Sequence, residues 1–227
     1  MNGALIAFTV AVAALAVAVD LPVALALAWL LARRRWPGKA LVETLVTVPL
    51  VLPPVATGLL LLLLLGRHGW IGSLLEERLG VQVVFTWKAV VAAMAVMAFP
   101  LVVRAARVGF ESVDATLEDA ARSAGANPWQ VFFRVTLPLA RRGVLAGVVM
   151  GFARALGEFG ATMVVAGNIP GRTTTLPLAI YSDVLLGDNE AAMELIAVSL
   201  VIALLAVALG ERLARPLPGA PTNREDK

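Results

Sequence analysis

The chain has 227 residues, of which 59% are hydrophobic and only 15% are charged, and its mean hydropathy is +0.85, which excludes an ordinary soluble domain. There is no cysteine and one histidine, His68, so disulfide frameworks, thiolate metal sites and chemistry that needs several imidazoles are excluded. The net charge is +3, but in so apolar a chain basic residues mark the cytoplasmic loops of a membrane protein, and no nucleic-acid partner is expected.

The apolar runs predict an all-α integral membrane protein with about five transmembrane helices, because a span requires about 20 mostly apolar residues. One transmembrane domain is expected over residues 1–215. A flexible cytoplasmic tail, rich in proline and polar residues, is expected over residues 216–227. The predicted spans are residues 4–32, 40–65, 83–103, 143–166 and 191–210.

The first predicted span carries no basic residue before Arg33, so it lacks the charged start of a cleavable signal peptide and is expected to remain in the membrane. Asp20 and Pro22 interrupt it. This leaves two alternatives, one kinked helix over residues 4–32 or a shorter span with an interfacial extension.

The second predicted span contains Pro49, Pro53 and Pro54, which remove backbone donors and clash with preceding carbonyl groups, so a straight helix is not expected. A broken helix is tolerated in a membrane where protein or water covers it. The break is interpreted either as a discontinuity beside a solute passage or as a simple packing kink.

The longest polar stretch, residues 104–142, predicts two short helices on the cytoplasmic side. The first spans about residues 113–124 and ends at Gly125, which can adopt the left-handed conformation. Asn127 and Pro128 are typical of a helix start, so a second helix is expected up to about residue 135, where Leu137-Pro138 ends it. This second helix has an aromatic face formed by Trp129, Phe132 and Phe133. Such a face must be covered by the protein's own helix ends or by another polypeptide.

The fourth predicted span contains two distinct patterns. Glycines at positions 143, 147 and 151 form a stripe that allows close helix packing. Arg154 and Glu158 lie one helical turn apart, and either charge alone would be costly inside a bilayer. The pair is interpreted either as a structural ion pair or as the electrostatic lining of an anion path.

The loop after this span places turn-forming residues beside donors for an oxyanion. It is either a plain exposed turn or an outer contact site for an oxyanion or a binding protein. The candidate contact residues are Asn168, Arg172, Thr173, Thr174 and Thr175.

The basic residues predict the orientation of the chain. With five spans, fourteen of the 19 Lys and Arg residues fall on one side of the membrane, and only Arg67, Arg78, Lys88 and Arg172 fall on the other. Because cytoplasmic loops carry the excess of basic residues, the N-terminus is expected outside and the C-terminus in the cytoplasm.

The polar stretch also carries a motif. Asp119-Ala120-Ala121, Gly125 and Val135-Thr136-Leu137-Pro138 have the spacing of the EAA loop, and the chain here resembles permease subunits of bacterial ABC importers, although that family usually has Glu where Asp119 stands and often Ile where Val135 stands. The resemblance implies a type I importer permease fold and a coupling helix that docks into an ATPase subunit. The implied coupling residues are Asp119, Ala120, Ala121, Gly125, Trp129, Phe132, Leu137 and Pro138.

The chain lacks a phosphate-binding loop of its own, since Gly38-Lys39-Ala40 has neither the first glycine nor the hydroxyl residue that such a loop requires. No bound cofactor is therefore expected, and the resemblance implies that ATP and Mg belong to the partner ATPase. It further implies a second copy of the chain, two ATPase subunits and an extracytoplasmic oxyanion-binding protein as partners, in the lipid of a bacterial or archaeal cytoplasmic membrane.

Over most of its length the chain is similar to molybdate permeases, the ModB family. The segments that carry this similarity are Gly157-Glu158-Phe159-Gly160-Ala161, residues 167–173 and residues 176–181. The similarity implies import of molybdate or tungstate. A sulfate or thiosulfate permease is the alternative. A further alternative is an ion-coupled secondary transporter that uses Asp20, Arg154 and Glu158. An intramembrane enzyme is disfavoured because the chain has a single histidine and no cysteine.

Overall fold

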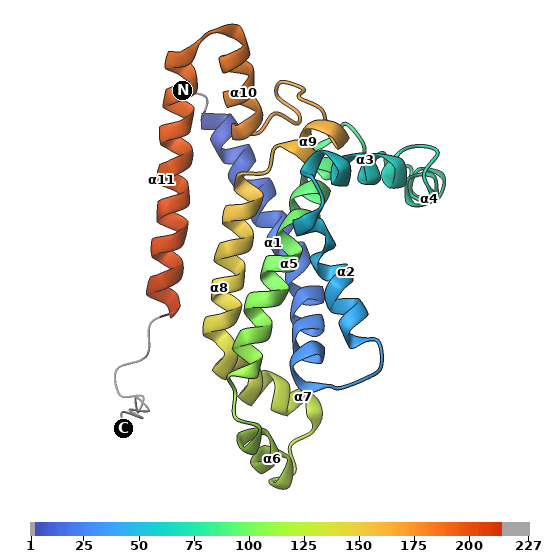
Figure 1. Ribbon diagram of the computed structural model, residues 1–227, viewed down its shortest axis with the longest axis vertical. Coiled ribbons are helices and arrows are strands. Elements are labelled where there is room, and N and C mark those ends of the chain that lie inside the picture. The colour runs from blue at the N-terminus through green and yellow to red at the C-terminus, as the bar shows by residue number, and fades with distance from the viewer. Residues whose placement is uncertain (1–2, 215–227) are drawn as a thin grey trace.

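The computed structural model describes residues 3–214, and the predicted tail over residues 216–227 lies outside them. Figure 1 shows an elongated bundle of long helices with short helices at both ends. The elements are α1 (Gly3–Arg33), α2 (Lys39–Val51), α3 (Pro54–Leu65), α4 (Trp70–Leu79), α5 (Trp87–Glu111), α6 (Ala115–Ser123), α7 (Pro128–Val131), a π-helix (Phe132–Thr136), α8 (Leu137–Leu156), α9 (Gly160–Val165), α10 (Leu176–Leu186) and α11 (Asn189–Ala214).

Five passes through a membrane account for the long apolar elements of the described residues. Four helices are long and apolar enough to cross alone, and the bent pair α2–α3 adds a fifth pass if it is counted as one broken span. The predicted bounds need correction, because α5 starts at Trp87 rather than at residue 83 and continues to Glu111. The fourth pass begins before residue 143 and its helix stops at Leu156, short of residue 166.

The first pass is one helix of 31 residues, which decides between the two alternatives for residues 4–32. Pro22 lies inside it and Asp20 is buried, with 8% of its surface exposed. The helix stays continuous through Pro22 because its buried face packs into the core formed with α5 and α8. The small residues on this face include Ala13, Ala16 and Ala24. Packing thus overrides the local preference of proline.

The second pass is broken, as its prolines predict. Leu52 adopts an extended conformation, Pro53 precedes the first residue of α3, and the two helices are bent by 110°. Pro49, by contrast, is accommodated inside α2. Residues 40–65 are therefore not one straight span.

The glycine stripe of α8 forms its contact with α5. A Cβ atom at Gly143 would lie 2.3 Å from the Cα of Gly109, and one at Gly147 would lie 3.0 Å from the carbonyl oxygen of Val102. Gly151 packs against the Val102 side chain. The missing side chains allow the two backbones to touch, which confirms the stripe as a packing surface.

Two short helices, α4 and α10, lie outside the predicted spans. Each has about ten residues, too few for a span, and therefore gives no transmembrane signal. Local chemistry nevertheless defines α10, because Pro177 occupies its first turn and Gly187 ends it with a φ of +77°.

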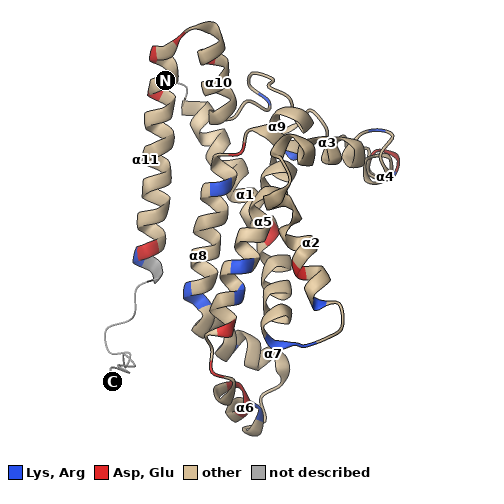
Figure 2. Ribbon diagram, in the orientation of Figure 1, with Lys and Arg blue, Asp and Glu red and all other residues tan. Residues whose placement is uncertain are grey.

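Charge is distributed unevenly along the bundle (Figure 2). Most basic residues lie at one end, which we call the basic end, where α1 ends at Arg33 and α8 begins near Arg141 and Arg142. The short helices α6 and α7 also lie at this end, whereas α4, α9 and α10 lie at the opposite end.

Replacing Gly143 with Val should destabilise the bundle, because the added atoms would meet the backbone of Gly109 and the carbonyl oxygen of Ala105. Because backbone atoms cannot rotate away, the free energy of unfolding is expected to fall by at least about 1–3 kcal/mol. Thermal unfolding of the full chain in detergent should show a lower midpoint. Ala146→Val, at an exposed position of the same helix, should leave the midpoint near the wild-type value; equal midpoints for the two variants would contradict the assignment.

Candidate coupling surface and charged pair

The helices α6 and α7 form a hairpin at the basic end, as the sequence predicts. Gly125 has a φ of +90°, and the Ala126 N–H donates to the Ala121 carbonyl oxygen at 3.0 Å, which ends α6. The Asn127 side chain accepts from the Gln130 N–H and the Gln130 side chain accepts from the Asn127 N–H, both at 2.9 Å. This reciprocal cap fixes the start of α7.

The start of α6 has its own cap, which the sequence analysis did not identify. The Asp114 carboxylate accepts from the Thr116 N–H at 2.9 Å. This hydrogen bond lowers the pKa of Asp114 below its ordinary value, so the carboxylate stays charged and continues to cap the helix under mildly acidic conditions.

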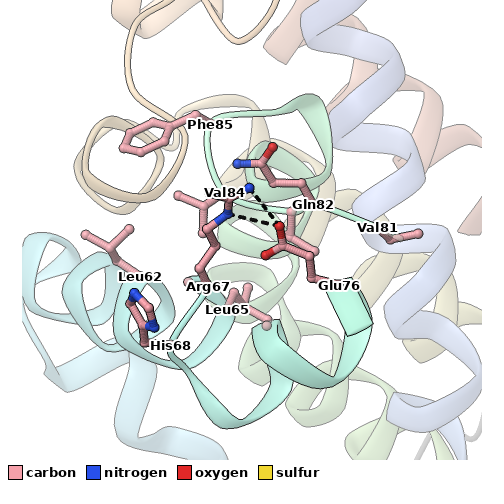
Figure 3. Close-up of a pocket in the computed structure, with 12 residues that line it drawn as sticks. Leu62, Leu65, Arg67, His68, Glu76, Val81, Gln82, Val84 and Phe85 are labelled. Atoms are coloured by element: carbon pink, nitrogen blue, oxygen red, sulfur yellow. Dashed lines mark hydrogen bonds and ion pairs between the residues drawn. The ribbon is translucent and has the colours of Figure 1, made fainter. Parts of the chain in front are cut away.

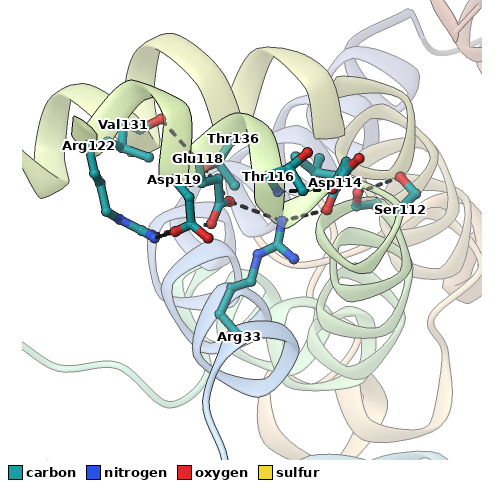
Figure 4. A network of polar contacts seen from close by, with 11 residues as sticks. Arg33, Ser112, Asp114, Thr116, Glu118, Asp119, Arg122, Val131 and Thr136 are labelled. Carbon is teal, nitrogen blue, oxygen red and sulfur yellow. Dashed lines mark hydrogen bonds and ion pairs between the residues drawn. The ribbon is translucent and has the colours of Figure 1, made fainter. Parts of the chain in front are cut away.

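A buried carboxylate ties the hairpin to the rest of the bundle (Figure 4). Glu118, on α6, has 3% of its surface exposed. It accepts from Arg33 Nη2 at 3.0 Å and from Thr136 Oγ1 at 2.7 Å. Arg33 also donates to the Val113 carbonyl oxygen at 2.8 Å. One acidic group therefore joins the end of α1, helix α6 and the segment that leads into α8.

The acidic residue of the sequence motif is the neighbouring Asp119 and not the buried Glu118. Asp119 is exposed and pairs only with Arg122 among the described residues. Ala120 is exposed and Ala121 is partly buried, so this face of α6 is open to solvent. The sequence could not separate Glu118 from Asp119, because the apolar residues of α6, Leu117 and Ala120, recur at helical spacing but lie on its exposed side, so the apolar pattern points away from the buried Glu118.

The predicted aromatic face of the hairpin is divided between two environments. Phe132 packs against Trp29 and Phe110, each with a centroid separation of 6.0 Å. Trp129 and Phe133 stack on each other but remain 73% and 56% exposed. The protein's own helix ends thus cover one ring and leave two rings facing outward.

The second helix of the hairpin does not end at Leu137-Pro138, which corrects the sequence-based expectation. A π-helix over Phe132–Thr136 connects α7 directly to α8, and the Leu137 N–H donates to the Phe132 carbonyl oxygen. Pro138 lies in the first turn of α8, just after this wider turn, and the helix passes through it. Leu137 is partly buried and Pro138 is exposed. The hairpin is consequently continuous with a membrane-spanning helix.

Arg154 and Glu158 form an ion pair with an Nη1–Oε2 distance of 2.7 Å. They do not lie on one helix, because α8 ends at Leu156 and residues 157–159 break the chain. The other carboxylate oxygen of Glu158 accepts from the Ala161 N–H at 2.8 Å. Glu158 is 1% exposed, whereas the Arg154 side chain is 26% exposed, so the arginine is the accessible member of the pair.

The break after α8 lies against the break after α2. A Cβ atom on Gly58 of α3 would lie 2.8 Å from the Ala161 backbone, and one on Gly160 would lie 2.9 Å from Pro54 Cβ. The two half-helices α3 and α9 therefore cross in direct contact (Figure 1). Each covers the irregular backbone of the other, as a bilayer requires.

The loop between α9 and α10, which carries the predicted outer contact residues, uses most of its polar groups internally. Thr174 donates to Asn168 Oδ1 at 2.7 Å, and Asn168 donates to Ser182 at 2.7 Å. Thr173 and Thr175 are fully buried and do not face the outer surface. Of the five candidate contact residues, Arg172 is the fully exposed one.

A cavity of about 290 Å³ opens beside α3 and α4 at the same end (Figure 3). Arg67 and Glu76 point toward each other in it, with an Nη2–Oε1 distance of 2.9 Å, and His68 lies on its wall. Because the acid neutralises the arginine, the cavity offers no strong site for an anion.

The arrangement of these elements is that of an ABC importer permease. The structure superposes on inward-facing conformations of the MetNI methionine ABC transporter with a TM-score of 0.70, covering 92% of each chain at 19% identity. It also superposes on a bacterial ABC transporter involved in alginate import with a TM-score of 0.70, covering 93% of this chain and 79% of that one at 18% identity. These likenesses establish the fold.

The chain belongs to the family described as the inner membrane component of binding-protein-dependent transport systems, whose model matches residues 21–217. Its relatives include the molybdenum transport system permease ModB of Escherichia coli K12, 47% identical over 90% of each chain, and that of Haemophilus influenzae, 48% identical over 86% of each. The sulfate transport system permease CysW of Synechococcus elongatus is 41% identical over 84% of this chain and 68% of its own. The chain is therefore a multi-pass membrane permease.

Replacing Glu118 with Gln should loosen the hairpin, because Arg33 would lose its charged partner in a buried site. The free energy of opening the hairpin is expected to fall by about 1–3 kcal/mol. Hydrogen exchange of the amides over residues 112–136, measured on the full chain, should accelerate by roughly tenfold or more. Asp119→Asn removes the same charge from the exposed neighbour and should change exchange little. Indistinguishable exchange in the two variants would show that Glu118 is not the anchor.

Proposed function

We propose that this permease is the membrane subunit of an ATP-driven importer for the oxyanion molybdate or its congener tungstate. The observation that carries the proposal is the identity of 47–48% with molybdenum permeases over 86–90% of the chain. Identity with the sulfate permease CysW is 41%, so sulfate is the second candidate. The choice of oxyanion rests on this difference.

The exposed half of the hairpin supports a coupling role. Trp129 and Phe133 present a stacked aromatic surface at the basic end, beside the motif residues Asp119 and Ala120. Large exposed aromatic rings at a polar surface favour a protein partner. We assign this surface to an ATPase subunit, which supplies ATP and Mg, and we place it in the cytoplasm with the N-terminus of the chain outside.

The remaining partners follow from the same assignment. Two copies of the chain, each bound to one ATPase subunit, enclose the solute path, and an extracytoplasmic binding protein delivers the oxyanion at the opposite end. No bond of the solute is made or broken. Closure of the ATPases on ATP moves the hairpins, and the spans alternate between inward-open and outward-open states.

The continuous helix from Pro128 to Leu156 is suited to transmit this motion. A displacement of α7 moves α8 because no flexible loop separates them. The Glu118–Arg33 contact conveys the same displacement to α1. Both routes lead from the hairpin into the membrane-spanning part.

Arg154 is our candidate for the electrostatic lining of the path. It is partly exposed at the end of α8, and Glu158 balances its charge, which weakens retention of an anion. An arginine so placed attracts a dianion without holding it tightly.

Replacing Gly125 with Val should abolish ATP-driven molybdate uptake, because a β-branched residue is strained at a φ of +90° and would displace the hairpin. Uptake of radiolabelled molybdate is measured in proteoliposomes that contain the chain, its ATPase and its binding protein. Gly38→Val imposes the same strain, at a φ of +91°, between α1 and α2, and should retain most uptake.

Competition by unlabelled anions in the wild-type assay identifies the substrate. Molybdate and tungstate should compete at far lower concentrations than sulfate. Stronger competition by sulfate would assign the protein to the second candidate function, and uptake driven by an ion gradient without ATP would overturn the ABC mechanism.

Replacing Arg154 and Glu158 together with Leu should reduce uptake by about tenfold, equivalent to about 1.4 kcal/mol in the barrier. The double substitution removes both charges, so no unpaired charge remains to unfold the chain. Lys39→Leu with Glu43→Leu removes another i,i+4 pair at the basic end and should reduce uptake less. Unchanged flux in the Arg154/Glu158 variant, with assembly intact, would make the pair purely structural.

A further inference from the structure

An apolar groove of about 530 Å³ runs between α1, α8 and α11. Its volume lies within the range of roughly 300–1,000 Å³ that is typical of small-molecule sites. The groove is lined by apolar residues and glycine, and the space between α1 and α11 is open because α11 contacts the rest of the described chain mainly through α8 and α10. The residues that define its walls are Leu145, Val148 and Phe152 on α8 and Ile202, Leu205 and Leu209 on α11.

The two helices cross at the base of the groove. A Cβ atom on Gly210 would lie 2.3 Å from Val149 Cγ2, so α8 and α11 touch there. The helices run in opposite directions (Figure 1), so Arg142, which precedes Val149 on α8, and Arg212, which follows Gly210 on α11, both lie on the basic-end side of the crossing. At 1.5 Å per residue these arginines lie about 10 Å and about 3 Å below the crossing.

The arginines continue the apolar stripes of the groove. Arg141, Leu145, Val148 and Phe152 follow one another at intervals of four, three and four residues on α8. On α11, Ile202, Leu205, Leu209 and Arg212 follow at intervals of three, four and three. Residues at these intervals share a helix face. Each wall of the groove therefore ends in a basic residue at the same end.

These arginines are available to a ligand. Arg141, Arg142 and Arg212 are exposed, and none of them forms an ion pair with another described residue. Arg33 and Arg107, at the same end of the bundle, are both paired with glutamates. Glu211 lies next to Arg212, which leaves the rim with a net positive charge.

We propose that the groove binds an anionic phospholipid, with one acyl chain against the apolar walls and the phosphate between Arg142, Arg212 and Arg141. A lipid with one long apolar body and one anionic end matches an apolar groove whose basic residues stand at one rim only. Basic pockets between transmembrane helices bind anionic headgroups in this way. The site is independent of the solute that the permease carries.

The test measures lipid retention on the full chain by native mass spectrometry after purification in mild detergent with added phosphatidylglycerol or phosphatidylcholine. Wild-type protein should retain one phosphatidylglycerol per copy in preference to phosphatidylcholine. Arg141→Gln with Arg212→Gln should lower phosphatidylglycerol retention by about tenfold. Arg34→Gln with Arg35→Gln removes two other exposed arginines and should leave retention unchanged.

A second pair of variants tests the acyl-chain part of the site without altering charge. Ala206→Phe fills the groove and should abolish retention of the lipid, whereas Ala208→Phe, on the same helix but outside the groove, should retain it. Equal retention of the two lipids by the wild type, or retention unaffected by the Arg141/Arg212 substitutions or by the Ala206 substitution, would overturn the proposal. Disulfide cross-linking between copies through Leu205→Cys, the sole thiol of such a variant, would show that a second copy occupies the groove instead.

Discussion

The direct backbone contact between Gly109 and Gly143 is the constraint on which the functional end of the molecule depends. It fixes the separation of α5 and α8 close to the hairpin, because Gly109 lies about half a turn before the end of α5 and Gly143 lies roughly one and a half turns after the start of α8. With a side chain on either glycine the two helices would spread, and the hairpin would have to span a wider gap. The placement of the aromatic surface therefore follows from two residues that lack side chains.

Within that frame the hairpin is held at both of its ends by different means. Its first helix is fixed by the buried Glu118 carboxylate, which receives hydrogen bonds from Arg33 and Thr136. Its second helix is fixed by continuity with α8 through the π-helix. The outward surface remains free for a partner because the hairpin's stability comes from contacts on its opposite side.

Much of this architecture could be predicted from the sequence, since composition, length and turn chemistry act locally. The five passes, the glycine stripe, the left-handed Gly125 and the Asn127 cap all follow from residue type and spacing. The anchoring role of Glu118 could not be predicted, because it depends on Arg33, which lies 85 residues away. The helical path through Pro138 was also missed, since a π-turn arises from tertiary packing rather than from a recognisable residue pattern. The roles assigned to Asp119, Arg154 and Arg172 in transport remain predictions.

The crossing of α3 and α9 limits how the solute path can open. Gly58 and Ala161 are so close that no side chain separates their backbones, and pulling them apart would uncover part of the irregular backbone at both chain breaks. The two half-helices, α3 and α9, are therefore expected to move together as one rigid unit. If the spans change shape, we therefore expect the bending to occur at the 110° break between α2 and α3 and at residues 157–159, and not at the tightly packed crossing.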